Sequence, residues 1–198
     1  MTLDNLANIY QHQLLDTMYF MFVEYPKSLF VINSNKSNFM HLTGLQRCAE
    51  FKHYKPSGFF DFCLHDSREV SSLNFTTRAD RNMVLLKTNT FDNCYKAIHN
   101  PSSIYVSNKN LICVTMCTNN GKIKLFSIAF VQDRNDTTWH PATIQVDKNR
   151  ESSVILKSAR PIIITKVQEA NKRGVLEAMR KNGKTLEDVK NFFIKRVI

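Results

Sequence analysis

The strongest constraint on the fold of this chain is an Asn-Gly pair that separates two apolar segments. The pair lies within Thr118-Asn-Asn-Gly-Lys122, between residues 111–118 and 122–131, which are rich in β-branched and aromatic residues. A type I′ turn needs positive φ at both central residues, and Asn-Gly tolerates that conformation well. We therefore expect an antiparallel β-hairpin here.

Other segments have the composition or periodicity of strands and helices. Strands are expected at residues 19–23, 28–32, 103–106, 154–156 and 162–166. Helices are expected at residues 3–18, 38–42, 59–64 and 71–98, with a break at 88–90, and in two runs after residue 168, the second capped by Thr185. This mixture of helices and antiparallel strands predicts an α+β fold.

The chain is strongly basic for its size. Its 198 residues carry a formal net charge of +10, which favours an anionic partner, nucleic acid first and a membrane surface second. No segment approaches the roughly 18 consecutive apolar residues of a membrane span, and the first residues lack the pattern of a secretory signal. We expect a nucleic-acid partner, no membrane insertion and a cytoplasmic site of action.

The five cysteines are scattered among apolar residues, so they are expected to be reduced residues of the core. Cys113 and Cys117 should share one face of a strand, but no second pair of Cys or His follows at zinc spacing. We expect no metal site and no cofactor.

The stretch from Lys36 to Leu45 is the first candidate for chemistry. It places His41 and Thr43 before Gly44, which is suited to end a short helix capped by Ser34 or Ser37. An imidazole titrates near neutral pH and can act as a general acid or base. The alternative is a histidine that only packs in the core.

The second candidate is Trp139-His140-Pro-Ala-Thr143, which is expected to be a loop. A ring for stacking on a base, an imidazole and a hydroxyl together would suit a nucleotide pocket. The alternative is a loop anchored by a buried tryptophan.

Two separated histidines are compatible with metal-free RNA cleavage. One group must take the proton of the 2′-hydroxyl, another must protonate the leaving 5′-oxygen, and cations must hold the phosphate. His41 and His140 are the candidates for the proton transfers. The candidate cations are Lys109, Lys122, Lys124, Lys157 and Arg160. The chain has no Gly-rich phosphate loop, no Gly-x-Ser-x-Gly elbow and no carboxylate cluster for two metal ions.

Residues 38–45 read Asn-Phe-Met-His-Leu-Thr-Gly-Leu, which contains the motif Asn-Phe-x-His-Leu-x-Gly. Weaker motifs follow in Gly58-Phe-Phe, residues 109–112 and 125–130, Pro141-Ala-Thr143 and Pro161-Ile-Ile. With these motifs the sequence resembles the phage-associated nuclease group related to barnase, EndoU, colicin and RelE toxins (the BECR fold), specifically its fourth subgroup.

The resemblance implies N-terminal helices packed on an antiparallel sheet of four to five strands, and a metal-independent ribonuclease acting in phage or plasmid conflict. It implies that His41 is catalytic, that Thr143 supplies a hydroxyl and that a strand lysine binds phosphate. It spans about residues 3–167. We therefore expect a nuclease domain at residues 1–167 and a basic helical extension at 168–198.

The leading hypothesis is a metal-independent endoribonuclease in which His41 is the acid or base, Lys109 or Lys124 stabilises the phosphate, and Thr143 and Trp139 hold the RNA. The partner is then RNA, and an antitoxin or immunity protein is a further candidate. One alternative is a nucleic-acid-binding or phage structural module that keeps the fold without turnover. A nucleotide transferase with a similar basic pocket is the third hypothesis.

Overall fold

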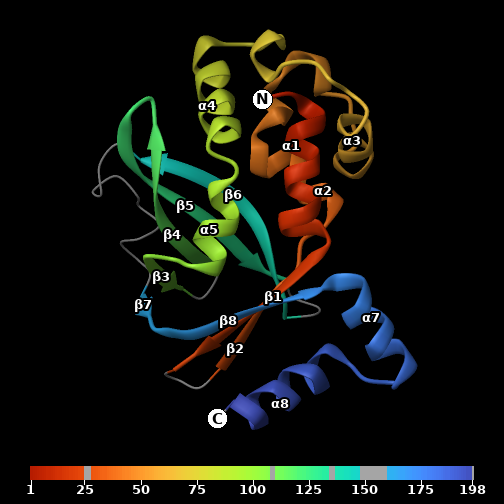
Figure 1. The fold of residues 1–198 in the computed structure, drawn as a ribbon. Helices are drawn as coiled ribbons and strands as arrows, with labels where there is room; N and C mark the ends of the chain where they lie inside the picture. Colours follow the sequence, from red (N-terminus) through yellow and green to blue (C-terminus); the bar gives the residue numbers. More distant parts are fainter. Residues whose placement is uncertain (25–27, 108–109, 134–136, 148–159, 198) are drawn as a thin grey trace.

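A computed structural model describes residues 1–24, 28–107, 110–133, 137–147 and 160–197. One curled mixed sheet of eight strands runs through the molecule, in the order β7-β3-β4-β5-β6-β2-β1-β8 (Figure 1). The strands are β1 Thr17–Val23, β2 Ser28–Ile32, β3 Ser103–Val106, β4 Asn110–Asn119, β5 Lys122–Gln132, β6 Trp139–Asp147, β7 Arg160–Ile162 and β8 Ile164–Asn171.

The expected count of four to five strands is wrong, because the N-terminal hairpin and the segment after residue 160 join the same sheet. β1 pairs with β2 on one side and β8 on the other, both antiparallel. The two halves of the sheet meet between β2 and β6, where Ile32 and Trp139 form a single parallel pair. The expectation of a purely antiparallel sheet is therefore also corrected.

The Asn-Gly hairpin is confirmed. Asn120 and Gly121 have φ of 51° and 69°, as a type I′ turn requires. β4 and β5 pair from Asn119–Lys122 to Asn110–Val131 in one continuous register. This ladder continues through β5 to β6, which places Thr143 opposite Ala129.

The helices are α1 Leu3–Tyr10, α2 Lys36–Thr43, α3 Pro56–Cys63, α4 Arg78–Asn89, α5 Asn93–His99, α7 Lys172–Lys181 and α8 Leu186–Val197. α1 continues as a π-helical turn, Gln11–Leu15. The expected break at residues 88–90 is confirmed by the end of α4 and the start of α5. Thr185 caps α8 through reciprocal hydrogen bonds with Asp188.

Several local expectations were wrong. Residues 17 and 18 begin β1 instead of ending the first helix, and α4 begins at Arg78 instead of residue 71. The N-cap of α2 is Asn35, because Asn35 and Asn38 form a reciprocal capping box in place of the expected serine cap. Residues 139–143 begin strand β6, because their backbone pairs with β5. Residues 168–171 belong to β8 instead of a helix, because the edge of β1 supplies backbone partners there. The strand expected at residues 154–156 lies outside the described residues.

The sheet is covered on both faces where β1 crosses it. Tyr19 and Met21 belong to the main core beneath the N-terminal helices. Their neighbours Met18, Phe20 and Phe22 form a second cluster that contacts residues of α7 and α8. Because side chains alternate along a strand, β1 contributes residues to both hydrophobic clusters. Figure 1 shows α7 and α8 on the opposite side from α1–α4.

The cysteines follow the sequence-based expectation, because all five are free and buried. None of the described helices is long and apolar enough to cross a membrane. The division of the chain at residue 167 stays a prediction, and β8 spans that position.

Candidate active site

The last turn of α2 presents His41 to solvent. The surrounding residues Phe39, Met40 and Leu42 are buried, whereas His41 is exposed. Gly44 ends the helix with φ of 79°, and its backbone N–H donates to the carbonyl oxygen of His41 at 3.2 Å. The apolar residues therefore fix the helix against the core and leave the imidazole accessible.

Thr43 has a different environment from His41. Its side chain is fully buried, and its hydroxyl donates to the carbonyl oxygen of Phe39 at 2.8 Å. A threonine hydroxyl commonly satisfies its hydrogen bond in this way inside a helix. The candidate hydroxyl in the motif thus stabilises α2 from within.

Lys87 joins α4 to β6 next to the end of α2. Its Nζ donates to Thr143 Oγ1 at 3.2 Å. A Cβ atom at Gly44 would lie 3.5 Å from Lys87 Cδ, so the stem of the lysine runs close to the helix end. Three elements therefore place an imidazole-bearing turn, an amine and a hydroxyl in one region.

Lys87 is largely buried, and its environment changes its acid–base behaviour. Burial is the main cause that lowers the pKa of this amine, and the nearby charge of Arg47 lowers it further. An ammonium group held away from water gains more than an exposed one from an anionic ligand. Lys87 is thus suited to contact a phosphate.

Sequence reasoning missed Lys87, although a signal was present. The lysine follows Val84 by three residues and precedes Thr88, and both of these residues are fully buried. Positions three and four apart lie on one face of a helix. A lysine on the buried face of α4 needs a polar partner or a function, and that pattern was readable in the sequence.

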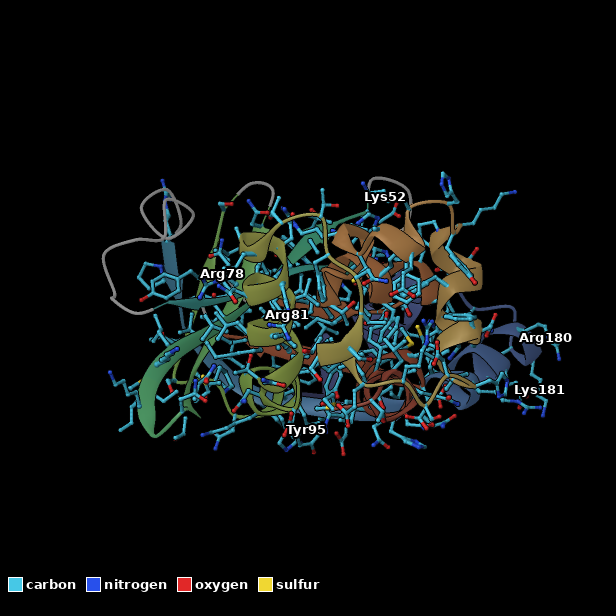
Figure 2. The ribbon with its side chains drawn as sticks, turned by 90° about the horizontal axis from the view of Figure 1, so that it is seen from above. Lys52, Arg78, Arg81, Tyr95, Arg180 and Lys181 are labelled. Carbon is cyan, nitrogen blue, oxygen red and sulfur yellow. The ribbon has the colours of Figure 1, made fainter. Side chains whose placement is uncertain are left out.

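Basic side chains lie beside this region, near the start of α4. Arg47 forms an ion pair with Asp80 at 2.6 Å. The hydroxyl of Thr77 and the guanidinium of Arg47 hold the pKa of the Asp80 carboxyl below its usual value. Figure 2 shows the exposed residues Arg78 and Arg81 projecting from α4 and Lys52 from a neighbouring turn. Arg47 is therefore the cation whose charge reaches Lys87, and the other three lie toward the start of α4.

His140 lies in β6 in a more enclosed setting. The residue is 9% exposed, and its Nε2 lies 2.9 Å from Thr138 Oγ1 and 3.7 Å from Asp133 Oδ2. Trp139 is 4% exposed, and its ring packs edge-on against Phe30 with centroids 5.6 Å apart. Both rings thus contribute to the packing around the start of β6.

The other candidate cations lie away from Thr143. Lys124 is five residues along β5 from Ala129, the partner of Thr143, which corresponds to about 17 Å in a strand. Lys122 is farther along the same strand. Arg160 begins β7 at the far edge of the sheet, beyond β3, β4 and β5. The predicted sites at Lys109 and Lys157 lie outside the described residues.

Within the described ranges, no group of three or more His, Cys, Asp or Glu side chains is arranged to hold a metal ion. The groups around α2 include the imidazole of His41, the amine of Lys87, the hydroxyl of Thr143 and the guanidinium group of Arg47. This set can transfer protons and stabilise negative charge.

The family model described as phage-Barnase-EndoU-ColicinE5/D-RelE like nuclease 4 matches residues 2–191. The chain belongs to this nuclease family. The resemblance carried by residues 38–45 is confirmed, and the match extends beyond residue 167 to include β8, α7 and part of α8. Comparisons with curated proteins and with solved structures gave no match. Membership of this family supports a nuclease function and a nucleic-acid substrate.

Proposed function

We propose that this nuclease cleaves RNA without a metal ion at the site formed by His41, Lys87 and Thr143. The observation that supports the proposal most is the contact between Lys87 Nζ and Thr143 Oγ1 beside the exposed His41 turn. Gly44, which ends the motif, and Thr143 of β6 are distant in the sequence, yet both lie close to Lys87.

In the proposed reaction the 2′-oxygen attacks the adjacent phosphorus, and the bond from phosphorus to the 5′-oxygen breaks. A general base takes the proton of the 2′-hydroxyl, and a general acid gives a proton to the leaving 5′-oxygen. The products are a 2′,3′-cyclic phosphate and a 5′-hydroxyl. Negative charge develops on the phosphate oxygens in the transition state. A hydrogen-bond donor that is already in position stabilises this charge.

His41 is the proposed acid or base, because its imidazole is accessible at the end of α2. Lys87 is proposed to stabilise the charged phosphate, with Thr143 fixing the position of the amine. The second proton transfer has two candidates. Lys87 releases a proton more readily than an ordinary lysine, because burial lowers its pKa, and His140 is the candidate from the sequence.

A non-catalytic nucleic-acid-binding module is the second candidate function. The basic surface formed by Arg47, Lys52, Arg78 and Arg81 favours it, because cations that neutralise phosphates bind RNA whether or not it is cut. If the protein cleaves RNA, an antitoxin or immunity protein is a further proposed partner.

The test is incubation of end-labelled RNA with the full chain in excess EDTA. We expect cleavage by the wild type, loss of cleavage in His41→Ala, and normal cleavage in His65→Ala, whose histidine is also exposed but lies after α3. Cleavage by His41→Ala at the wild-type rate would remove the proposed role of His41. A wild type that binds RNA and cuts none would favour the binding module.

A further inference from the structure

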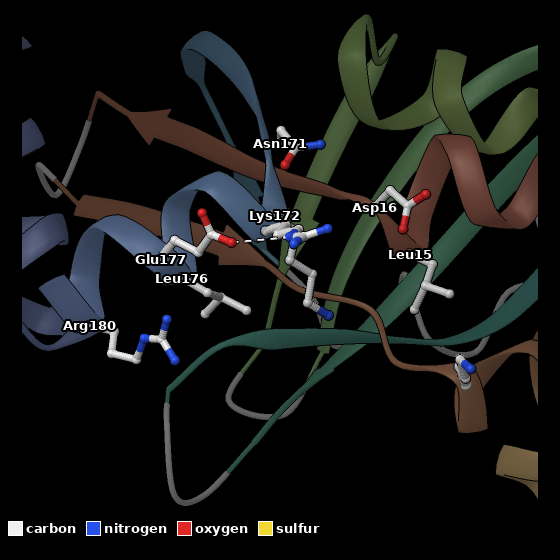
Figure 3. A pocket seen from close by; sticks show the side chains of 9 residues that line it. Leu15, Asp16, Asn171, Lys172, Leu176, Glu177 and Arg180 are labelled. Carbon is white, nitrogen blue, oxygen red and sulfur yellow. Dashed lines mark hydrogen bonds and ion pairs between the residues drawn. The ribbon is translucent and has the colours of Figure 1, made fainter.

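A second charged region lies at the opposite end of α2. A cavity of about 770 Å³ opens where β8 passes into α7 beside the start of α2 (Figure 3). Its charged lining residues are Asp16, Lys36, Lys172, Arg173, Glu177 and Arg180. Four cations face two carboxylates, so the cavity favours an anion.

Lys172 is held in place within this cavity. Its Nζ donates to the carbonyl oxygen of Ser34 at 2.6 Å, and its backbone N–H donates to the carbonyl oxygen of Asp16 at 2.8 Å. The side chain is half-buried, and burial lowers the pKa of its amine. A positioned cation that has lost part of its hydration interacts more strongly with an anion than a fully solvated one.

The remaining cations can turn toward a ligand. The ion pairs of Lys36 with Asp61 at 2.6 Å and of Arg173 with Glu177 at 3.1 Å are exposed, and exposed pairs contribute little. No carboxylate of the described residues forms an ion pair with Arg180. A guanidinium in this state is well suited to a bidentate contact with phosphate oxygens.

Exposed residues of α2 connect the cavity to His41: Lys36 lines the cavity, and its neighbour Ser37 lies on the same helix face as His41, four residues on. Lys36, Ser37 and His41 are all exposed residues of this helix. Lys36 and His41 are five positions apart in the helix, which corresponds to about 7.5 Å along the axis. A single nucleic-acid strand that reaches His41 can therefore continue along Ser37 into the cavity.

We propose that this cavity binds backbone phosphates of the same RNA strand, next to the phosphate that is cleaved. The inference rests on the proposed function, because it assigns the cavity to the substrate of the His41 site. Lys36, Lys172 and Arg180 contact phosphate oxygens, and the bases make no specific contact there. The cavity therefore adds affinity for longer RNA without adding sequence preference.

The test measures binding of a fully 2′-O-methylated RNA, which has no 2′-hydroxyl to attack, as a function of salt. Loss of one phosphate contact should reduce the salt slope of log K by about 0.7 and weaken binding about fivefold at 0.1 M salt. Arg180→Gln and Lys36→Gln are the variants. Lys181→Gln is the matched control, because Lys181 neighbours Arg180 on α7 (Figure 2) but does not line the cavity.

We expect Arg180→Gln and Lys36→Gln to lower the slope for a long oligonucleotide, while Lys181→Gln changes it by less than half as much. The effect should disappear for a dinucleotide, which fills only the His41 site. If Arg180→Gln and Lys36→Gln behave like Lys181→Gln, the inference is wrong. It is also wrong if Arg180→Gln abolishes binding of inorganic phosphate but leaves the affinity for long RNA unchanged.

The outcome for the cavity is separate from the outcome for catalysis. A His41-dependent cleavage with no effect of Arg180→Gln on RNA binding would retain the proposed function and remove the cavity as a subsite. A lowered salt slope in Arg180→Gln, with no cleavage of any RNA by the wild type, would retain the cavity as an RNA-binding site and remove the proposed function.

Discussion

The two candidate histidines occupy contrasting environments. His41 lies at the end of a short helix whose apolar residues are buried while its imidazole is exposed. His140 is a strand residue that is 9% exposed, and its Nε2 lies 2.9 Å from the hydroxyl of Thr138. An accessible imidazole can exchange protons with a substrate, whereas an enclosed one that is hydrogen-bonded mainly supports its surroundings.

Separate replacement of the two histidines should give the largest difference in cleavage rate. His41→Ala should lower the single-turnover cleavage rate by about 10²–10⁴-fold, the usual contribution of a general acid or base, with little change in stability. His140→Gln should instead lower the free energy of unfolding by about 1–3 kcal/mol, because buried partners lose a hydrogen bond. Denaturant unfolding and single-turnover kinetics measure both quantities. Equal rate losses in the two folded variants would assign His140 the second proton transfer.

The next largest effect on the cleavage rate is expected for Lys87→Met, which removes the amine that contacts Thr143. Loss of a donor that stabilises the phosphate should reduce the cleavage rate by about 10²–10³-fold. Stability should be retained, because the variant removes a largely buried charge. A folded Lys87→Met protein with normal cleavage would contradict the role given to this residue.

The pH dependence of stability provides a second measurement on Lys87. Burial holds its pKa in the folded protein below the usual 10.5, so the unfolded chain binds this proton more tightly. The stability of the wild type relative to Lys87→Met should therefore rise as the pH increases from the folded pKa toward 10.5. A relative stability that falls over this window would indicate that the native structure favours the charged amine.

Substitution of Gly44 and of Gly121 distinguishes the loss of stability caused by backbone strain from a loss of activity at the site. Gly44 and Gly121 have φ of 79° and 69°, and a Cβ would approach Lys87 only at Gly44. Each substitution to alanine should cost about 1 kcal/mol, because left-handed backbone disfavours a side chain. Only Gly44→Ala should also slow cleavage, measured as kcat at a temperature where both variants are folded. Equal activity of the two variants would show that the Gly44 turn does not position the site.

The smallest effect is expected at Thr43. Thr43→Val removes the hydroxyl that donates to the carbonyl of Phe39 but keeps the shape of the side chain. The free energy of unfolding should fall by about 0.5–1.5 kcal/mol, and the cleavage rate of the folded protein should stay within about twofold. A large loss of rate without a loss of stability would place the hydroxyl of Thr43 in the chemistry.

Local sequence signals predicted much of the fold, and long-range pairing explains what they missed. The Asn-Gly turn, the helix-ending Gly44 and the break between α4 and α5 are determined by neighbouring residues, so they were readable. Residues 168–171 of β8 were assigned to a helix because their pairing with β1 depends on residues about 150 positions away. The contact of Lys87 with Thr143 spans 56 positions, so the sequence analysis identified neither this lysine nor its partnership with Thr143.

The most direct test of the central claim compares two RNAs that differ at one atom. The cleavage position of a short RNA is mapped first, and a second RNA carries a 2′-deoxy nucleotide on the 5′ side of that bond. In excess EDTA we expect the wild type to cut the parent RNA to a 2′,3′-cyclic phosphate and to leave the substituted bond intact. Equal cleavage of both RNAs, or cleavage that appears only when a divalent metal ion is restored, would contradict the account.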